Sequence, residues 1–170
     1  LQEIGQTGID GVVSVQASQT LKETEFLSSY ARGHGFIKGV VGWVPFAEPD
    51  VEAHIERFAD EPKIVGMRHV VQDEPDDAFI LGTAFNDGIS HLKNHALIYD
   101  ILIYERQLEP SIQFVDRHPD QVFVLDHIAK PRISDSLITP WKEQILDQPP
   151  QRRFSSLFSS SASPLIHCSA

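Results

Sequence analysis

The sequence predicts an α/β protein in which strands and helices alternate along the chain. Short runs rich in Val and Ile, the residues that strands prefer, recur from end to end. Stretches with apolar residues at helical spacing lie between these runs. Successive strand-like runs begin about 25–35 residues apart, which is close to the repeat of a barrel built from eight βα units.

Five runs are expected to form strands. Strands that alternate with helices form a parallel sheet with right-handed crossovers. A (β/α)8 barrel and a doubly wound sheet both have this rhythm, but no Gly-rich phosphate turn of a dinucleotide-binding domain follows the first run. The runs cover residues 11–17, 37–46, 63–71, 97–104 and 122–128.

Four helices are expected between the strands. The first covers residues 20–33 and begins with Thr20 and Glu23 at the spacing of a capping box. The second covers residues 50–59, with Asp50 as its N-cap. The residues expected to face the core are Phe26, Leu27, Tyr30 and Ala31 in the first helix, Val51, Ile55 and Phe58 in the second, Phe85, Ile89 and Leu92 in the third, and Leu108, Ile112 and Val115 in the fourth.

Composition sets the domain organisation and excludes several classes of protein. The 170 residues suffice for one domain, and 41% hydrophobic with 22% charged residues is typical of a globular chain. We expect this domain to cover residues 1–147, and residues 148–170, which are rich in Ser and Pro, to form a disordered tail. The net charge of −10 argues against a phosphate-binding surface and against nucleic acid.

The expected partner is therefore a small-molecule substrate, and the sequence sets no oligomeric state. No apolar run approaches the roughly 18 residues of a membrane span, and no signal peptide is visible. The single cysteine, Cys168, excludes a disulfide framework and a multi-cysteine zinc site. One cysteine fits a reducing compartment, so we expect a cytoplasmic protein.

Polar residues gather near the carboxyl ends of the predicted strands. Because strand side chains alternate between faces, Leu125 and His127 share one face and Asp126 takes the other. A barrel predicts this pattern, since the upper end of its lumen holds ligand-binding groups. On the same reasoning, Arg68 shares a face with Gln72 if that strand runs on, Asp100 with Tyr104, and Ser14 with Gln16.

Two of these residues are candidates for catalysis. A neutral imidazole binds a metal ion or takes a proton near pH 7, so His127 is the first candidate, unless it is a strand-end His hydrogen-bonded to a neighbour. The guanidinium of Arg68 can hold a carboxylate or polarise a carbonyl, unless it forms a salt bridge to Asp73 or Glu74. Lys130 is expected to be a solvated loop charge.

Four stretches in this order resemble the amidohydrolase-related (amidohydrolase 2) family of TIM-barrel hydrolases, and in particular its lactone hydrolases. They are GVVSVQA, GVVGWVPF, VGMRHVVQDEPD and FVLDHIAKP, within a match from Gly11 to Trp141. The resemblance makes the predicted strands two to six of eight. It thus implies a partial (β/α)8 TIM barrel that is incomplete at both ends.

The resemblance also implies roles for residues of the site. His127 would line the active site as a catalytic residue and as the one candidate metal ligand, and Arg68 would act on the substrate with it. The substrate-binding residues would be Gln72 from the same comparison and, from the strand faces, Asp100, Tyr104 and Gln16. The expected cofactor is one divalent metal ion, Zn or Mn, or none.

The implied activity is hydrolysis of a sugar-acid or carboxylic-acid lactone by water attack on a polarised carbonyl. Two alternatives stay open: a metal-dependent decarboxylase of the same superfamily, and a truncated, inactive fragment. The second arises because the chain starts at Leu1 and matches neither the family's strand-one His-x-His pair nor its strand-eight Asp. The proposed chemistry requires Arg68 and His127 to face one pocket at the same rim of the sheet.

Overall fold

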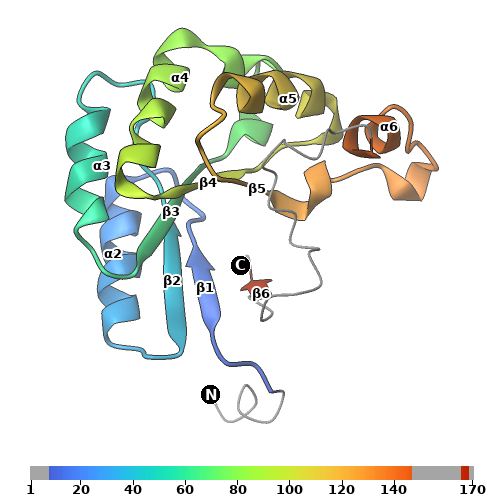
Figure 1. Cartoon of the computed structure of the whole chain (residues 1–170). Coiled ribbons are helices and arrows are strands. Elements are labelled where there is room, and N and C mark those ends of the chain that lie inside the picture. The colour runs from blue at the N-terminus through green and yellow to red at the C-terminus, as the bar shows by residue number, and fades with distance from the viewer. Residues whose placement is uncertain (1–7, 147–165, 169–170) are drawn as a thin grey trace.

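The computed structural model describes residues 8–146 and 166–168, and its strands form one parallel sheet (Figure 1). The spatial order of the strands is β5-β4-β3-β2-β1-β6. Their bounds are Val12–Val15 for β1, Ile37–Gly42 for β2, Ile64–His69 for β3, Ile98–Ile101 for β4, Phe123–Leu125 for β5 and Ile166–Cys168 for β6.

The order of the strands separates the two predicted architectures. Strands β1 to β5 are neighbours in chain order, so the sheet is wound in one direction only. A doubly wound sheet would reverse direction at a switch point. The sheet is also curled (Figure 1). The partial barrel is therefore confirmed, and each of β1 to β5 lies inside its predicted range but ends earlier.

The four predicted helices are confirmed, and Figure 1 shows them following one another around the outside of the curled sheet. One-handed crossovers place all such helices on one side of a singly wound sheet. Within the described residues, a further short helix, α6, follows β5. The bounds are Leu21–Arg32 for α2, Val51–Ala59 for α3, Thr83–Ser90 for α4, Leu108–Arg117 for α5 and Trp141–Leu146 for α6.

The predicted buried face of α2 was wrong in part. Phe26 and Tyr30 are 62% and 48% exposed, and the helix instead buries the small residues Thr24, Ser28 and Ala31. The reason is a close approach to β2. The Thr24 hydroxyl accepts a hydrogen bond from the Trp43 backbone N–H and donates to its carbonyl, both at 2.8 Å. A helix this close to the sheet leaves no room for aromatic side chains between them.

An aromatic cluster fills the space between the outer face of the sheet and the helices α4 and α5. Tyr99 of β4 lies at its centre and is fully buried. The ring centroids of Phe46, Phe85, Phe114 and Phe123 lie between 5.5 and 6.3 Å from that of Tyr99, mostly edge to face. Each such pair adds about 0.5–1.5 kcal/mol beyond area burial. This cluster fixes β4 and β5 against their helices.

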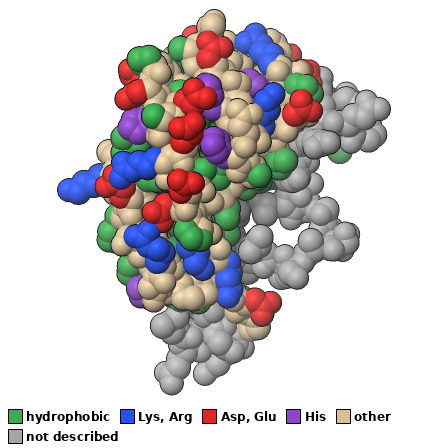
Figure 2. Space-filling view, turned by 60° about the vertical axis from the view of Figure 1, so that its left-hand side comes forward, with side chains coloured by type: hydrophobic (Ala, Val, Ile, Leu, Met, Phe, Trp, Pro, Cys, Tyr) green, Lys and Arg blue, Asp and Glu red, His purple; other side chains and the backbone are tan. Residues whose placement is uncertain are grey.

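The outer surface over α2 and α3 carries side chains of both charge signs (Figure 2). Arg57 of α3 pairs with Glu25 of α2 at 2.6 Å, and Arg32 pairs with Glu61. Both pairs are largely exposed, so each adds little to stability. Among the described residues, no helix has the length and apolar character needed to cross a membrane.

Strand β6 falls within the predicted tail, where no strand was expected. Ile166, His167 and Cys168 pair with β1 in parallel register. The rest of that segment, from residue 148 to 165 and 169 to 170, lies outside the described residues. The division of the chain near residue 147 therefore stays a prediction.

A glycine in α4 provides a test of this packing. A methyl group at Gly88 would lie 2.1 Å from the backbone oxygen of Phe46, so α4 can approach the loop after β2 only without a side chain here. Although alanine ordinarily stabilises a helix interior, we expect Gly88→Ala to lower the free energy of unfolding by about 1–3 kcal/mol. Urea denaturation measures this change.

Gly35→Ala is the matched control, because no atom lies within 4 Å of the added methyl group. Its effect should stay within about 0.5 kcal/mol. A Gly88→Ala variant as stable as the control would show that α4 packs less closely than described.

Candidate active site

A buried charged cluster joins three strands at their carboxyl ends. Arg68, at the end of β3, is 5% exposed. Its Nη1 donates to Oδ2 of Asp126 at 2.8 Å, and its Nη2 donates to the backbone carbonyl of Gln16 after β1. Gln16 Nε2 donates in return to the backbone carbonyl of Arg68 at 3.3 Å. The cluster therefore links β1, β3 and the turn after β5.

The partner of Arg68 differs from both predicted ones. We expected a salt bridge to Asp73 or Glu74 as the alternative to a functional role, but the ion pair forms with Asp126, 58 residues away. The Glu74 carboxylate instead lies 2.7 Å from Nε2 of His69. With side-chain exposures of 6% and 4%, the Arg68–Asp126 pair is shielded from water, where charges interact more strongly.

The register of the strands decides which residue meets Arg68. Asp100 of β4 lies beside Arg68, and Val124 of β5 lies beside Asp100. Neighbours in register share a face of the sheet, and the next residue on that face is Asp126, two positions after Val124. Asp126, one residue before His127, therefore occupies the position facing Arg68 where His127 was expected.

His127 lies in a backbone turn and is exposed. Strand β5 ends at Leu125, and the backbone of His127 has φ 50 and ψ 27, in the left-handed region. Among the described residues, no hydrogen bond or ion pair joins His127 to Arg68. The structure places both near the same end of the sheet but does not bring them into contact. The catalytic and metal-binding roles of His127 stay predictions.

The four predicted substrate-binding residues lie at this same end. Asp100 and Gln16 are fully buried. Strand β3 ends at His69, so Gln72 lies in a following 3-10 turn, where its N–H donates to Leu102 O at 3.0 Å. Tyr104 likewise follows the end of β4 and precedes a second turn. The expected continuation of both strands was wrong, but their residues stay at the rim.

Sequence reasoning missed Asp126 and Lys130. Lys130 was expected to be a solvated loop charge, but it is half-buried and its Nζ donates to Oε1 of Gln72. The same ammonium lies 5.1 Å from the centroid of the Tyr104 ring. The polar residues of LDHIAK marked this stretch as a candidate part of the site. The sequence does not show where β5 ends or how the following turn directs each side chain.

His69 occupies a buried aromatic setting on the outer side of the site. Trp43 Nε1 donates to its Nδ1 at 3.2 Å, so the ring proton lies on Nε2, which donates to Glu74. The Phe79 ring stacks on it at 5.1 Å. Burial lowers the pKa of His69 below its usual value, although the hydrogen bond with Glu74 acts in the opposite direction. Both ring nitrogens are satisfied, which indicates a structural role.

The donor set for a metal ion is incomplete in the part of the chain that the structure describes. No group of three His, Cys, Asp or Glu side chains there is arranged to hold a metal ion. Asp126 is engaged by Arg68, and His127 is the one candidate ligand that the sequence predicted. The described residues alone therefore do not form a complete metal site, and the expectation of one divalent metal ion or none stays a prediction.

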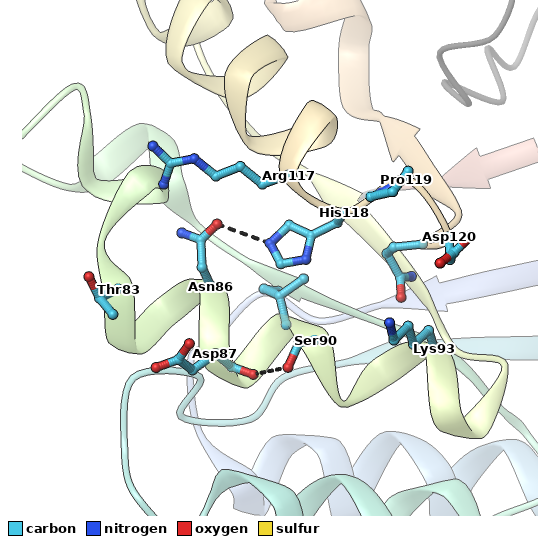
Figure 3. A pocket seen from close by; sticks show the side chains of 11 residues that line it. Thr83, Asn86, Asp87, Ser90, Lys93, Arg117, His118, Pro119 and Asp120 are labelled. Carbon is cyan, nitrogen blue, oxygen red and sulfur yellow. Dashed lines mark hydrogen bonds between the residues drawn. The ribbon is translucent and has the colours of Figure 1, made fainter.

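A separate hollow lies between α4 and the loop from α5 to β5 (Figure 3). It has a volume of about 340 Å³ and is lined by mixed charges, with His118 Nε2 bonded to Asn86 Oδ1 at 3.0 Å. Its loop precedes β5, so it lies toward the amino ends of the strands. Active sites of βα barrels lie at the carboxyl ends. We therefore place the site at Arg68 and not in this hollow.

A parallel sheet wound in one direction, with helices on its outside, defines part of a (β/α)8 barrel. Comparison with known proteins specifies the family. The amidohydrolase (Amidohydro_2) family model matches residues 1–158, and this chain belongs to the amidohydrolase family.

Two L-fucono-1,5-lactonases are among its relatives. The protein from Burkholderia ambifaria is 33% identical over 138 residues, which cover 81% of this chain and 48% of the relative. The protein from Burkholderia multivorans is 33% identical over 136 residues, which cover 76% of this chain and 46% of the relative. The chain thus spans about half the length of the curated relatives it matches.

Solved structures agree with this assignment. A zinc-bound amidohydrolase from Burkholderia multivorans matches with a TM-score of 0.76 and 33% identity, over 84% of this chain and 51% of that one. A structure of an amidohydrolase from the same organism with bound HEPES also gives a TM-score of 0.76, at 30% identity and the same coverage. The partial barrel of this chain therefore matches about half of the amidohydrolase structure.

The buried ion pair yields a prediction about stability. Removing one partner leaves the other charge buried and unpaired, so we expect Asp126→Ala to lower the free energy of unfolding by about 3–5 kcal/mol. Replacing both partners with apolar residues, as Arg68→Met with Asp126→Leu, should restore most of this loss. Urea denaturation of the variants measures both effects.

Glu25→Ala is the control, since it breaks the exposed Arg57–Glu25 pair and should cost less than about 1 kcal/mol. If Asp126→Ala costs no more than this control, the Arg68–Asp126 pair is not shielded from water as described.

The lowered pKa of His69 predicts how stability depends on pH. As pH falls below the ordinary value of 6.5, the unfolded chain binds a proton at His69 before the folded chain does. The free energy of unfolding should therefore decrease between pH 6.5 and 5.5. The pKa of His118 is also lowered by burial, so it contributes in the same direction.

Denaturation midpoints at pH 7.5, 6.5 and 5.5 test this, together with NMR titration of the His69 ring. A His118→Gln variant serves as the control and should keep the part due to His69. A His69 ring that protonates above pH 6.5 would contradict the described burial.

Proposed function

We propose that this chain forms part of a lactone hydrolase acting on a sugar-acid lactone such as L-fucono-1,5-lactone. The observation that carries the proposal is the buried guanidinium of Arg68 at the carboxyl end of β3. The similarity to two L-fucono-1,5-lactonases supports the substrate class. The partner would be a small molecule.

Lactone hydrolysis needs an activated water molecule and stabilisation of an oxyanion. The water oxygen bonds to the carbonyl carbon, the ring C–O bond breaks, and the ring oxygen takes up a proton to become a hydroxyl group. The product acid releases one proton and is left as a carboxylate. Preorganised donors aimed at the carbonyl oxygen supply the largest contribution to catalysis in such reactions.

Arg68 is the described residue best suited to this task. Two of its donors are fixed by Asp126 and Gln16, and its buried Nε–H has no hydrogen-bond partner among the described residues. Buried donors in native proteins are nearly always satisfied. A substrate oxygen would satisfy this one, and Asp100 and Gln16 would then line the substrate beside it.

His127 is proposed to act at the same rim, as a proton acceptor or as one ligand of a divalent metal ion. The zinc in the similar Burkholderia multivorans structure supports a metal in this family. A divalent ion supplies a Lewis acid that lowers the pKa of bound water. His127 would hold it only together with residues beyond those described, so the roles assigned above rest on Arg68.

The two alternatives from the sequence receive less support. Both named relatives are lactonases, which favours ester hydrolysis over decarboxylation. Nothing in these similarities favours an inactive fragment, and this chain has a buried charged cluster at the strand ends.

Hydrolysis of L-fucono-1,5-lactone by the purified chain, followed with a pH indicator in the presence and absence of zinc or manganese, tests the proposal. We expect turnover above the buffer background. Because His127 is exposed, His127→Ala should leave stability within about 0.5 kcal/mol. It should nonetheless reduce kcat/KM by roughly 10²–10⁴-fold, as loss of a general base does.

His54→Ala is the matched control, since His54 lies on the outer helix α3 and pairs with Asp50 at 3.4 Å. It should hydrolyse the lactone at the rate of the unchanged chain. Absence of turnover on L-fucono-1,5-lactone and a panel of other sugar lactones, with either metal or none, would refute the proposed function. Equal activity of the His127→Ala and His54→Ala variants would refute the role of His127.

A further inference from the structure

Residues beyond the ends of three consecutive strands meet around one aromatic ring. Gln72 follows β3, Tyr104 follows β4 and Lys130 follows β5. Lys130 Nζ donates to Gln72 Oε1 and lies 5.1 Å from the Tyr104 ring centroid. Arg106 lies 4.9 Å from the same centroid, and its Nη2 donates to the backbone carbonyl of Gln72 at 3.4 Å. Two cations therefore border a single ring.

The two cations differ in how their charge is balanced. Arg106 pairs with Asp77 at 2.8 Å, and both side chains are about half exposed. Among residues 8–146 and 166–168, no ion pair joins Lys130 to a carboxylate, and its described partners are the neutral Gln72 amide and the Tyr104 ring. A half-buried ammonium with only neutral partners keeps its attraction for an anion.

The backbone that holds Lys130 is strained. His127, Ile128, Ala129 and Lys130 have φ values of 50, 49, 60 and 47, so four successive residues without glycine are left-handed. The left-handed form is disfavoured for each such residue because its Cβ lies too close to the following carbonyl oxygen. Strain of this kind persists only where the surroundings fix it, and it concentrates at functional sites.

Three features of the turn hold its backbone in this left-handed conformation. Trp141 Nε1 donates to the carbonyl of Ile128 at 2.7 Å, the N–H of Lys130 donates to His127 O at 2.9 Å, and Ala129 is fully buried. An ordinary solvated lysine needs none of these contacts. The turn directs the ammonium of Lys130 toward Gln72 and Tyr104.

We propose that Lys130 is the residue that binds the acid group of the substrate's ring-opened form, so that the Lys130–Tyr104–Gln72 cluster selects sugar acids over neutral polyols. The proposal rests on the proposed lactone hydrolysis. As the ring opens, the carbonyl group becomes a carboxylate, and a positive charge with no anionic partner is placed to receive it. Lys130 would thereby stabilise the carboxylate of the ring-opened product.

Binding of L-fuconate, the ring-opened acid, to the purified chain tests this. We use isothermal titration, with the neutral polyol L-fucitol as the comparison ligand. Lys130→Met keeps the length of the side chain and removes the charge, so it should weaken L-fuconate at least tenfold and leave L-fucitol unchanged. Lys130→Arg keeps the charge and should bind L-fuconate within about threefold of the unchanged chain, with binding weakened by salt.

Arg132→Gln is the matched control, because Arg132 lies two residues further on, is exposed, and pairs with Glu105 at 2.9 Å. It should bind L-fuconate as the unchanged chain does. Urea denaturation of every variant shows whether it is folded, and the folded Lys130→Arg variant tests the charge if Lys130→Met is not. Failure of the unchanged chain to bind L-fuconate, or equal binding by folded Lys130→Met, would overturn the proposal.

The assay of lactone turnover separates this inference from the proposed function. The unchanged chain could turn over lactone while Lys130→Met binds L-fuconate as tightly as the unchanged chain does. That result would refute the role of Lys130 and would still support lactone hydrolysis. Binding that depends on Lys130 without turnover of any lactone would support an acid-binding site and refute hydrolysis.

Discussion

The ion pair between Arg68 and Asp126 is the interaction on which the carboxyl end of this sheet depends. Parallel strands are joined by long crossovers, so their carboxyl ends have no tight turn to hold them together. Here one guanidinium spans the strands, since it reaches Asp126 beyond β5 and the backbone of Gln16 beyond β1. Because both charges are shielded from water, separating them would leave two unpaired buried charges and strongly destabilise the fold.

The same interaction determines the path of the chain after β5. Asp126 must face inward to reach Arg68, and the chain then turns through four left-handed residues. This turn exposes His127 and brings Lys130 back to Gln72 at the rim. Three polar residues within five positions thus receive three different environments: buried and paired, exposed, and half-buried with neutral partners.

The sequence predicted what depends on local pattern and missed what depends on register. The strands and the amphipathic helices followed from apolar spacing, as the burial of Val51, Ile55 and Phe58 shows. The face of α2 did not, because the close approach of Thr24 to Trp43 depends on the distance between helix and sheet. Likewise, nothing local to Arg68 indicates a partner 58 residues away, or that the strand before His127 ends early.

The overall charge of the chain gives the positive groups at the rim their significance. A net charge of −10 repels an anionic sugar acid at long range, so attraction must come from cations within a Debye length of the ligand, about 8 Å at physiological salt. Arg68 is already neutralised by Asp126, and Arg106 is partly neutralised by Asp77. Of the cations in the described residues, Lys130 alone is half-buried at the carboxyl ends of the strands and has no described carboxylate partner. The charge of Arg68 is therefore balanced within the protein, and Arg68 is left with its Nε–H as a hydrogen-bond donor, whereas the charge of Lys130 can respond to the charge of a ligand.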